Sequence, residues 1–169
     1  AVETQSGCYG SATITVNVSS QPVVNVSASS SSICSGDSAL LTATGASTYS
    51  WSPSIDLSGS SGDSVFASPS SNVTFTAVGT QGGCTDTATI VITVNSAPVV
   101  SVSANTQTVC TGDSAILTAT GAGTYNWSPA AGLSATTGSI VNASPTSATT
   151  YSVSGTLNGC TSLSPATII

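Results

Sequence analysis

The sequence of 169 residues contains no lysine, arginine, histidine or methionine, and only 4% of its residues are charged. Six acidic residues give it a net charge of −6. Because no cation can neutralise phosphate groups, this composition excludes nucleic acids and anionic membrane surfaces as partners. The commonest general bases and nitrogen ligands for metals are missing as well. We therefore expect a protein that is not an enzyme and that needs no cofactor.

Long hydrophobic runs are also missing. No apolar stretch approaches the roughly 18 residues that span a bilayer, and no signal peptide is visible, so we expect no direct membrane insertion. The chain is nevertheless 39% apolar, with many β-branched residues. Disordered chains combine low hydrophobicity with high charge, which does not describe this sequence. The composition therefore predicts a β-rich fold with a surface of serine and threonine hydroxyls.

What the sequence does contain is an internal repeat with a period of 76 residues, the separation of Cys8 from Cys84 and of Cys34 from Cys110. The run CSGDSALLTATGASTYSWSP at 34–53 returns as CTGDSAILTATGAGTYNWSP at 110–129. The repeat needs no gap until CTDTATIVI, which starts at Cys84, becomes CTSLSPATII, which starts at Cys160. That change predicts a local bulge or a two-residue slip in the last strand.

The period divides the chain into three parts. We expect residues 1–20 to be the C-terminal strand of a preceding repeat, 21–96 to be a complete repeat, and 97–169 to be a repeat whose last strand is truncated. A chain that begins inside a repeat is expected to be a fragment of a longer array. The linkers between repeats are short, so neighbouring repeats should abut end to end.

Alternating apolar residues and turn signals predict short strands and no helix. In the first complete repeat we expect strands at 23–28, 39–44, 49–51, 64–67, 73–78 and 87–94. Six or seven such strands in each repeat favour an all-β fold of tandem immunoglobulin-like β-sandwiches. Trp51 and Trp127 occupy equivalent positions on the third strand, where a sandwich places a core tryptophan. The alternative is a carbohydrate-stacking platform, because Tyr49 and Trp51 share one face of their strand.

The recurring cysteines predict disulfide bonds. Two pairings are open. One lies within each repeat, as Cys34–Cys84 and Cys110–Cys160. The other crosses the junction from Cys34 to Cys160. It is suggested by the topology, because the turns that carry Cys34 and Cys84 would lie at opposite poles about 20 Å apart, whereas a disulfide needs Cα atoms within about 7 Å. Under either pairing Cys8 needs a partner upstream of residue 1.

The acidic residues are spread along the chain rather than clustered, at Glu3, Asp37, Asp56, Asp63, Asp86 and Asp113. No D-x-D-x-D-G run for calcium and no CxxC pair for zinc is present. We expect these acids to be solvated turn residues, with no metal site and no catalytic residue.

The block C-x-G-D-S-A-x-L-T-A-T-G-A-x-T-Y-x-W-S-P, followed by D-L-S or G-L-S, A-S-P and G-C-T, resembles the immunoglobulin-like and PKD-like repeats of Bacteroidota surface proteins. Such repeats fill large adhesins, gliding-motility adhesins among them, that the type IX secretion system exports. The resemblance implies an extracellular, bacterial cell-surface location and a stalk or adhesive role. The W-S-P tripeptide departs from the W-D-x-G-D-G stretch of standard PKD domains, so no role for those acids carries over.

Four of the acids stand in D-[ST]-[AV] triplets. This pattern matches the O-glycosylation sequon that Bacteroidota use on exported proteins, so the resemblance implies glycans at Ser38, Ser64, Thr87 and Ser114. The alternative is a chance match in a chain rich in serine and threonine.

Three functions follow. The leading one is a structural extracellular array, as a stalk, spacer or surface filament of a large bacterial adhesin-like protein, whose partners are neighbouring repeats of the same chain. The second is a binding module for surface polysaccharide or other cells. The third is a self-assembling filament subunit joined by donated strands. A lone strand expected at 11–18 invites the third function, but both repeats are expected to hold nearly full strand sets and to leave no acceptor groove.

Overall fold

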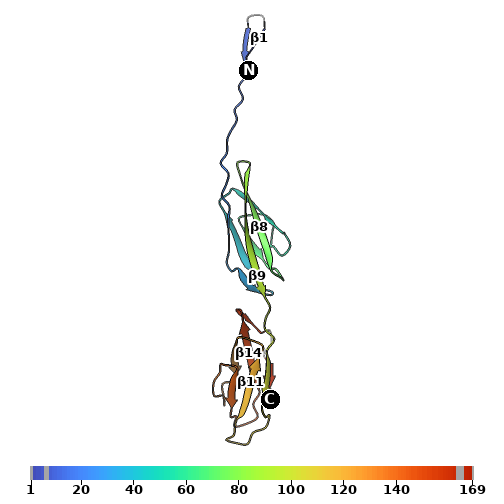
Figure 1. The fold of residues 1–169 in the computed structure, drawn as a ribbon, viewed down its shortest axis with the longest axis vertical. Helices are drawn as coiled ribbons and strands as arrows, with labels where there is room; N and C mark the ends of the chain where they lie inside the picture. Colours follow the sequence, from blue (N-terminus) through green and yellow to red (C-terminus); the bar gives the residue numbers. More distant parts are fainter. Residues whose placement is uncertain (1, 6–7, 163–165, 169) are drawn as a thin grey trace.

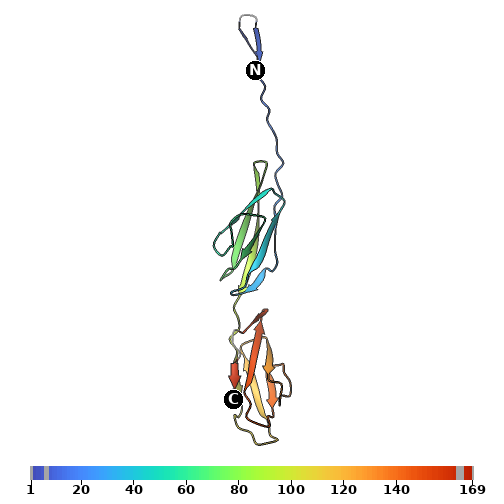
Figure 2. The same cartoon turned by 180° about the vertical axis from the view of Figure 1, so that it is seen from behind.

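The computed structural model describes residues 2–5, 8–162 and 166–168. An isolated hairpin pairs β1 (Val2–Gln5) with β2 (Cys8–Ser11). Two β-sandwiches follow, and Figures 1 and 2 show the hairpin and both sandwiches end to end along the long axis. We call residues 21–95 the first sandwich and residues 97–168 the second sandwich.

The described residues are all-β, and no helix among them is long and apolar enough to cross a membrane. In the first sandwich one sheet has the order β3 (Asn25–Ala28), β5 (Ala39–Thr44), β7 (Ser64–Ala67). The other sheet has the order β4 (Ser32–Cys34), β9 (Cys84–Asn95), β8 (Val73–Gln81), β6 (Thr48–Ser52). The short β4 runs parallel to the end of β9, and the other pairs are antiparallel. In immunoglobulin terms these are strands A, B and E facing A′, G, F and C, with no strand D.

The second sandwich repeats this order with two differences. One sheet contains β10 (Ser101–Ala104), β11 (Ala115–Thr120) and β13 (Ile140–Ala143). The other contains β12 (Thr124–Ser128), β14 (Tyr151–Leu157), β15 (Cys160–Thr161) and β16 (Ala166–Ile168). The described residues hold no counterpart of β4, and the counterpart of β9 is split into β15 and β16. Among the described residues, the second sandwich therefore has fewer paired residues in this sheet than the first.

Each sandwich has its own hydrophobic core, built by the alternation that the sequence predicts. Along β5, for example, every second residue is buried. The largest buried side chains of the first core include Leu41, Trp51 and Phe75. The tryptophan indole is 3% exposed and donates a hydrogen bond of 2.9 Å to the Gly62 carbonyl. Its counterpart Trp127 is 2% exposed, so burial holds both indoles away from any binding surface.

The last strand of the second sandwich slips by two residues relative to the first. Thr156 pairs with Thr161, as Thr80 pairs with Thr85. Further along, Val153 pairs with Ala166, whereas the repeat would place residue 164 there. The predicted two-residue slip is confirmed, and it explains why β9 has a broken counterpart.

The strand predictions need correction in three respects. The lone strand at 11–18 is wrong: β2 ends at Ser11, and residues 12–20 belong to no strand. A strand is held by hydrogen bonds to a neighbour, and residues 12–18 pair with no strand in the part of the chain that the structure describes. The short β4 was not predicted, because its three residues carry too little alternation to be seen. Strands β8 and β9 are also longer than expected, since they meet in a tight hairpin between Gln81 and Cys84.

Candidate functional site

The most distinctive site is the junction between the two sandwiches. Cys34, the last residue of β4, is bonded to Cys160, the first residue of β15, with the two Cα atoms 5.6 Å apart. The bond joins the first sandwich to the second, as the junction-crossing alternative predicts. The pairing within each repeat is not formed, and Cys84 and Cys110 are free thiols. The prediction for Cys8 lies outside the described side chains.

Local backbone structure brings the two junction cysteines together. β4 pairs in parallel with the end of β9, where Cys34 lies opposite Asn95. The Asn95 carbonyl accepts a hydrogen bond of 2.9 Å from the Ser35 amide. The same carbonyl oxygen lies 3.7 Å from the Cys160 Sγ. The end of β9 is thus fixed between the two cysteines just before the chain enters the second sandwich.

A shallow opening of about 470 Å³ lies beside this disulfide. It is lined from the first sandwich by Ile33, Asp37 and Ser38, among others, and from the second by Asn158 and Gly159 in the turn between β14 and β15. Its lining mixes polar and apolar groups, and the strands of the two sandwiches make only sparse contact with each other. The disulfide is the only covalent link across that contact besides the chain itself.

The free pole of the first sandwich, where Cys84 lies, has the same arrangement as the junction. The Cys84 Sγ lies 3.7 Å from the Ser19 carbonyl, just as the Cys160 Sγ lies 3.7 Å from Asn95. In addition, the Val24 amide donates a hydrogen bond of 2.8 Å to an Asp86 carboxylate oxygen. This hydrogen bond, together with one from the Thr87 amide, lowers the pKa of Asp86. The entering segment is thus held against Cys84 at a fixed position.

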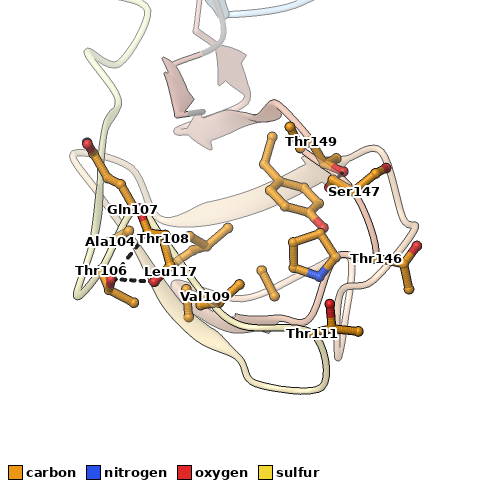
Figure 3. Close-up of a pocket in the computed structure, with 15 residues that line it drawn as sticks. Ala104, Thr106, Gln107, Thr108, Val109, Thr111, Leu117, Thr146, Ser147 and Thr149 are labelled. Atoms are coloured by element: carbon orange, nitrogen blue, oxygen red, sulfur yellow. Dashed lines mark hydrogen bonds between the residues drawn. The ribbon is translucent and has the colours of Figure 1, made fainter.

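A groove of about 450 Å³ opens at the far pole of the second sandwich, where Cys110 lies. One side is lined by Ala104, residues 106–109 and Thr111, and the other by residues 145–149, as the labelled side chains in Figure 3 show. Its floor includes Leu117, Ala143 and Tyr151. The expectation that both repeats leave no acceptor groove is therefore wrong. In the first sandwich the corresponding space is filled by the end of β9.

The remaining predicted site residues lie apart from one another. The four sequon hydroxyl residues Ser38, Ser64, Thr87 and Ser114 are all exposed. Tyr49 is half-buried. Its hydroxyl accepts a hydrogen bond from the Ala46 amide and donates one to the Ala46 carbonyl. Among the aromatic side chains that the structure describes, Phe66 alone is largely exposed, at 54%. No group of three acidic or cysteine residues gathers at one point in the described part of the chain.

Neither a protein-family model nor a curated protein matches this sequence. Three solved structures illustrate the likeness of its fold. A chain from the complex of a mouse coronavirus receptor-binding domain with its murine receptor is 16% identical, with a TM-score of 0.48 over 86% of this chain and 98% of that one. The Escherichia coli adhesin FdeC is 14% identical, with a TM-score of 0.41 over 86% of this chain and 63% of that one. Titin domains Z1Z2 in complex with telethonin are 16% identical, with a TM-score of 0.34 over 90% of this chain and 98% of that one. The immunoglobulin-like description of this chain rests on its own strand order.

Proposed function

We propose that the chain is part of a structural extracellular array, in which 76-residue immunoglobulin-like repeats form a stiff stalk or spacer of a bacterial surface protein. The observation that carries this proposal is the Cys34–Cys160 bond across the junction. Contacts between tandem domains are usually small, and hinge motion is their default behaviour. A disulfide beside a short linker gives each junction two covalent connections, which restricts bending and rotation.

The composition supports the same role. A stalk outside the cell must remain folded and soluble without help, and a disulfide suits an oxidising compartment. Salt bridges cannot stiffen this chain, because it has no cationic side chain. The alternative of a carbohydrate-binding module is weakened by the burial of Trp51 and Trp127, whose indoles are closed off from solvent. A stacking platform needs exposed aromatic faces.

Glycans at the four sequon residues would give the stalk a polar coat. Its surface carries few charges, so the glycans would help to keep it soluble. Ser38 is of most interest, because it lines the opening beside the junction disulfide. The intact mass of material from the native host tests this directly. A mass above that of the bare polypeptide, which Ser38→Ala lowers by one glycan, supports glycosylation. A mass equal to that of the bare polypeptide rules it out.

Small-angle X-ray scattering of the parent and of Cys34→Ser tests the stalk proposal. We expect the parent to have the scattering of one elongated particle and the variant to show added flexibility between two bodies. The matched control is Cys110→Ser, which removes an unbonded thiol of the same kind. Identical flexibility in the parent and in Cys34→Ser would contradict a stiffening role for the disulfide.

A further inference from the structure

The junction disulfide changes which part of the chain connects the two sandwiches. Cys34 and Cys160 are separated by 126 residues in the sequence. Their bond therefore closes a covalent loop that contains the polypeptide linker after Asn95 and most of both sandwiches, from β5 to β14. The shortest covalent route from one sandwich to the other does not enter this loop. It passes from Cys34 through the bond to Cys160, at the junction itself.

In the first sandwich this route runs from pole to pole. Figure 1 shows the chain entering at the pole away from the second sandwich, passing along the first sandwich and reaching the junction. β3 and β4 form this segment, and β4 ends at Cys34 opposite Asn95. A β-strand rises about 3.3 Å per residue, which is close to the limit of a fully extended chain. Tension along β3 and β4 can therefore add little length to them.

In the second sandwich the route begins at the junction. Cys160 starts β15, and it pairs with Leu157 at the end of β14. β16 pairs with the start of β14, where Tyr151 lies beside the far-pole groove. β15 and β16 are both antiparallel to β14, so the route leads from the junction toward the far pole. Its described residues in these strands are extended, as in the first sandwich.

Without the bond, a pulling force would pass through the interior of the first sandwich, because the chain leaves that sandwich at Asn95. β4 pairs in parallel with the end of β9 over only three residues. Backbone hydrogen bonds of 2.9 Å from the Ser35 amide to the Asn95 carbonyl and from the Thr93 amide to the Ser31 carbonyl flank this ladder. The force would pull β4 away from the junction and β9 toward it, and so would shear this short ladder. Once it opened, β5 to β9 would be free to unfold and lengthen.

We propose that the Cys34–Cys160 bond is a mechanical bypass, which carries a pulling force past the interior of both sandwiches and keeps the stalk from lengthening. A pulling force favours unfolding only through the length that unfolding releases. Unfolding inside a closed loop releases none between the two bonded cysteines. This inference rests on the proposed array function and adds a second property to it: stiffness concerns bending, whereas the bypass concerns length.

The length that the bond withholds is large enough to measure. A fully extended chain of 126 residues would reach about 420–450 Å at about 3.3–3.6 Å per residue. The first experiment pulls single molecules of the full chain by tags fused to its two ends, in buffer without a reductant. We expect no step of this order in the parent. We expect Cys34→Ser to lengthen in two steps, one for each sandwich, whose sum approaches the length of the loop. The matched control Cys110→Ser keeps the bond and should behave like the parent.

The second experiment uses the parent alone, so it does not depend on the folding of a variant. A small thiol is added while the oxidised parent is held under constant load. The reagent reduces the bond to two protein thiols and is itself oxidised to a disulfide. The same two lengthening steps should follow the reduction. The thiol should change nothing in Cys34→Ser, which has no junction bond to reduce.

Three results would overturn the bypass. One is a step of the loop's length in the parent before reduction, and another is a parent that keeps its length after reduction. The third is a Cys34→Ser variant that withstands the same load as the parent. Failure of the stalk proposal is distinguishable from all three, because X-ray scattering would then show an oxidised parent that bends freely at its junction while its length under load stays fixed.

Discussion

The two sandwiches share the same repeat and strand order but differ in how their second sheet ends. In the first, β9 continues to Asn95, so that β4 pairs on one side of it and β8 extends to Val73 on the other. In the second, the described pairing of β16 with β14 runs from Ala166 to Ile168. The buried core of the first sandwich, which includes Phe75 and Ile92, holds more residues among those described than the core of the second. We therefore expect the first sandwich to be the more stable of the two.

Removing the junction disulfide has the largest expected effect, because it lets the two sandwiches unfold separately. The bond spans a sequence separation of 126 residues, and the chain-entropy model gives such a crosslink about 5 kcal/mol. We expect Cys34→Ser to melt at a lower temperature in two steps, with the second sandwich first. Calorimetry measures this, and the control is Cys110→Ser. A single transition unchanged from the parent would contradict the coupling.

Truncating the core tryptophans ranks next and compares the two cores directly. Trp51→Ala and Trp127→Ala each delete a buried indole and its hydrogen bond to a glycine carbonyl. We expect each to cost on the order of 3–5 kcal/mol in its own sandwich. For the same loss of stability, Trp127→Ala should unfold the second sandwich at a lower denaturant concentration than Trp51→Ala unfolds the first. If Trp51→Ala melts like the parent, the indole is exposed in solution and the binding-module alternative gains.

Tyr151 and its counterpart Phe75 distinguish the cores at high pH. The Tyr151 hydroxyl donates a hydrogen bond of 2.8 Å to the Ala131 carbonyl, and burial raises the pKa of Tyr151. A raised folded-state pKa contributes stability that is present below the unfolded value near 10 and is lost as pH rises through the folded value. The second sandwich should therefore weaken first in alkali.

The variant Tyr151→Phe converts this site to the first-sandwich residue. It should cost about 0.5–1.5 kcal/mol at neutral pH, since one hydrogen bond is lost, and should flatten the alkaline decline. Denaturant melts between pH 8 and 11 measure both effects. An equal alkaline decline in the parent and the variant would assign the sensitivity to another group.

Asp86 makes the stability of the first sandwich slightly sensitive to acid. The second sandwich lacks this group, because Ser162 is the counterpart of Asp86. The Val24 and Thr87 amides lower the pKa of the Asp86 carboxyl. Stability from a lowered pKa is present above the unfolded value near 3.9 and is lost as pH falls through the folded value. We expect Asp86→Asn to reduce the loss of first-sandwich stability between about pH 4 and 2. A pH profile identical to that of the parent would rule out this contribution.

The sequence predicted the local elements better than the pole of the second sandwich. Strands β5 and β7 have the bounds that their alternation predicts, because each has one face in the core. The slip in the last strand was visible as two extra residues in an otherwise gapless repeat. The groove was not predicted, although the truncated last strand was. What was missing was the parallel pairing of β4 with the end of β9, a contact between segments some 60 residues apart that no local pattern records.

The disulfide pairing was undecided from spacing alone, because both pairings use cysteines of the same period. The pairing depends on which pole of the sandwich carries each cysteine turn. The order and direction of the paired strands determine that position.

Peptide mapping without reduction tests most directly whether consecutive sandwiches are joined covalently at their junction. Trypsin has no cleavage site in this chain, so the digestion uses proteases that cut at aromatic and acidic residues. We predict a peptide containing Cys34 linked to one containing Cys160, with Cys84 and Cys110 recovered as thiols from protein kept dilute and shielded from oxidants. Recovery of Cys34 linked to Cys84 and of Cys110 linked to Cys160 would contradict the account.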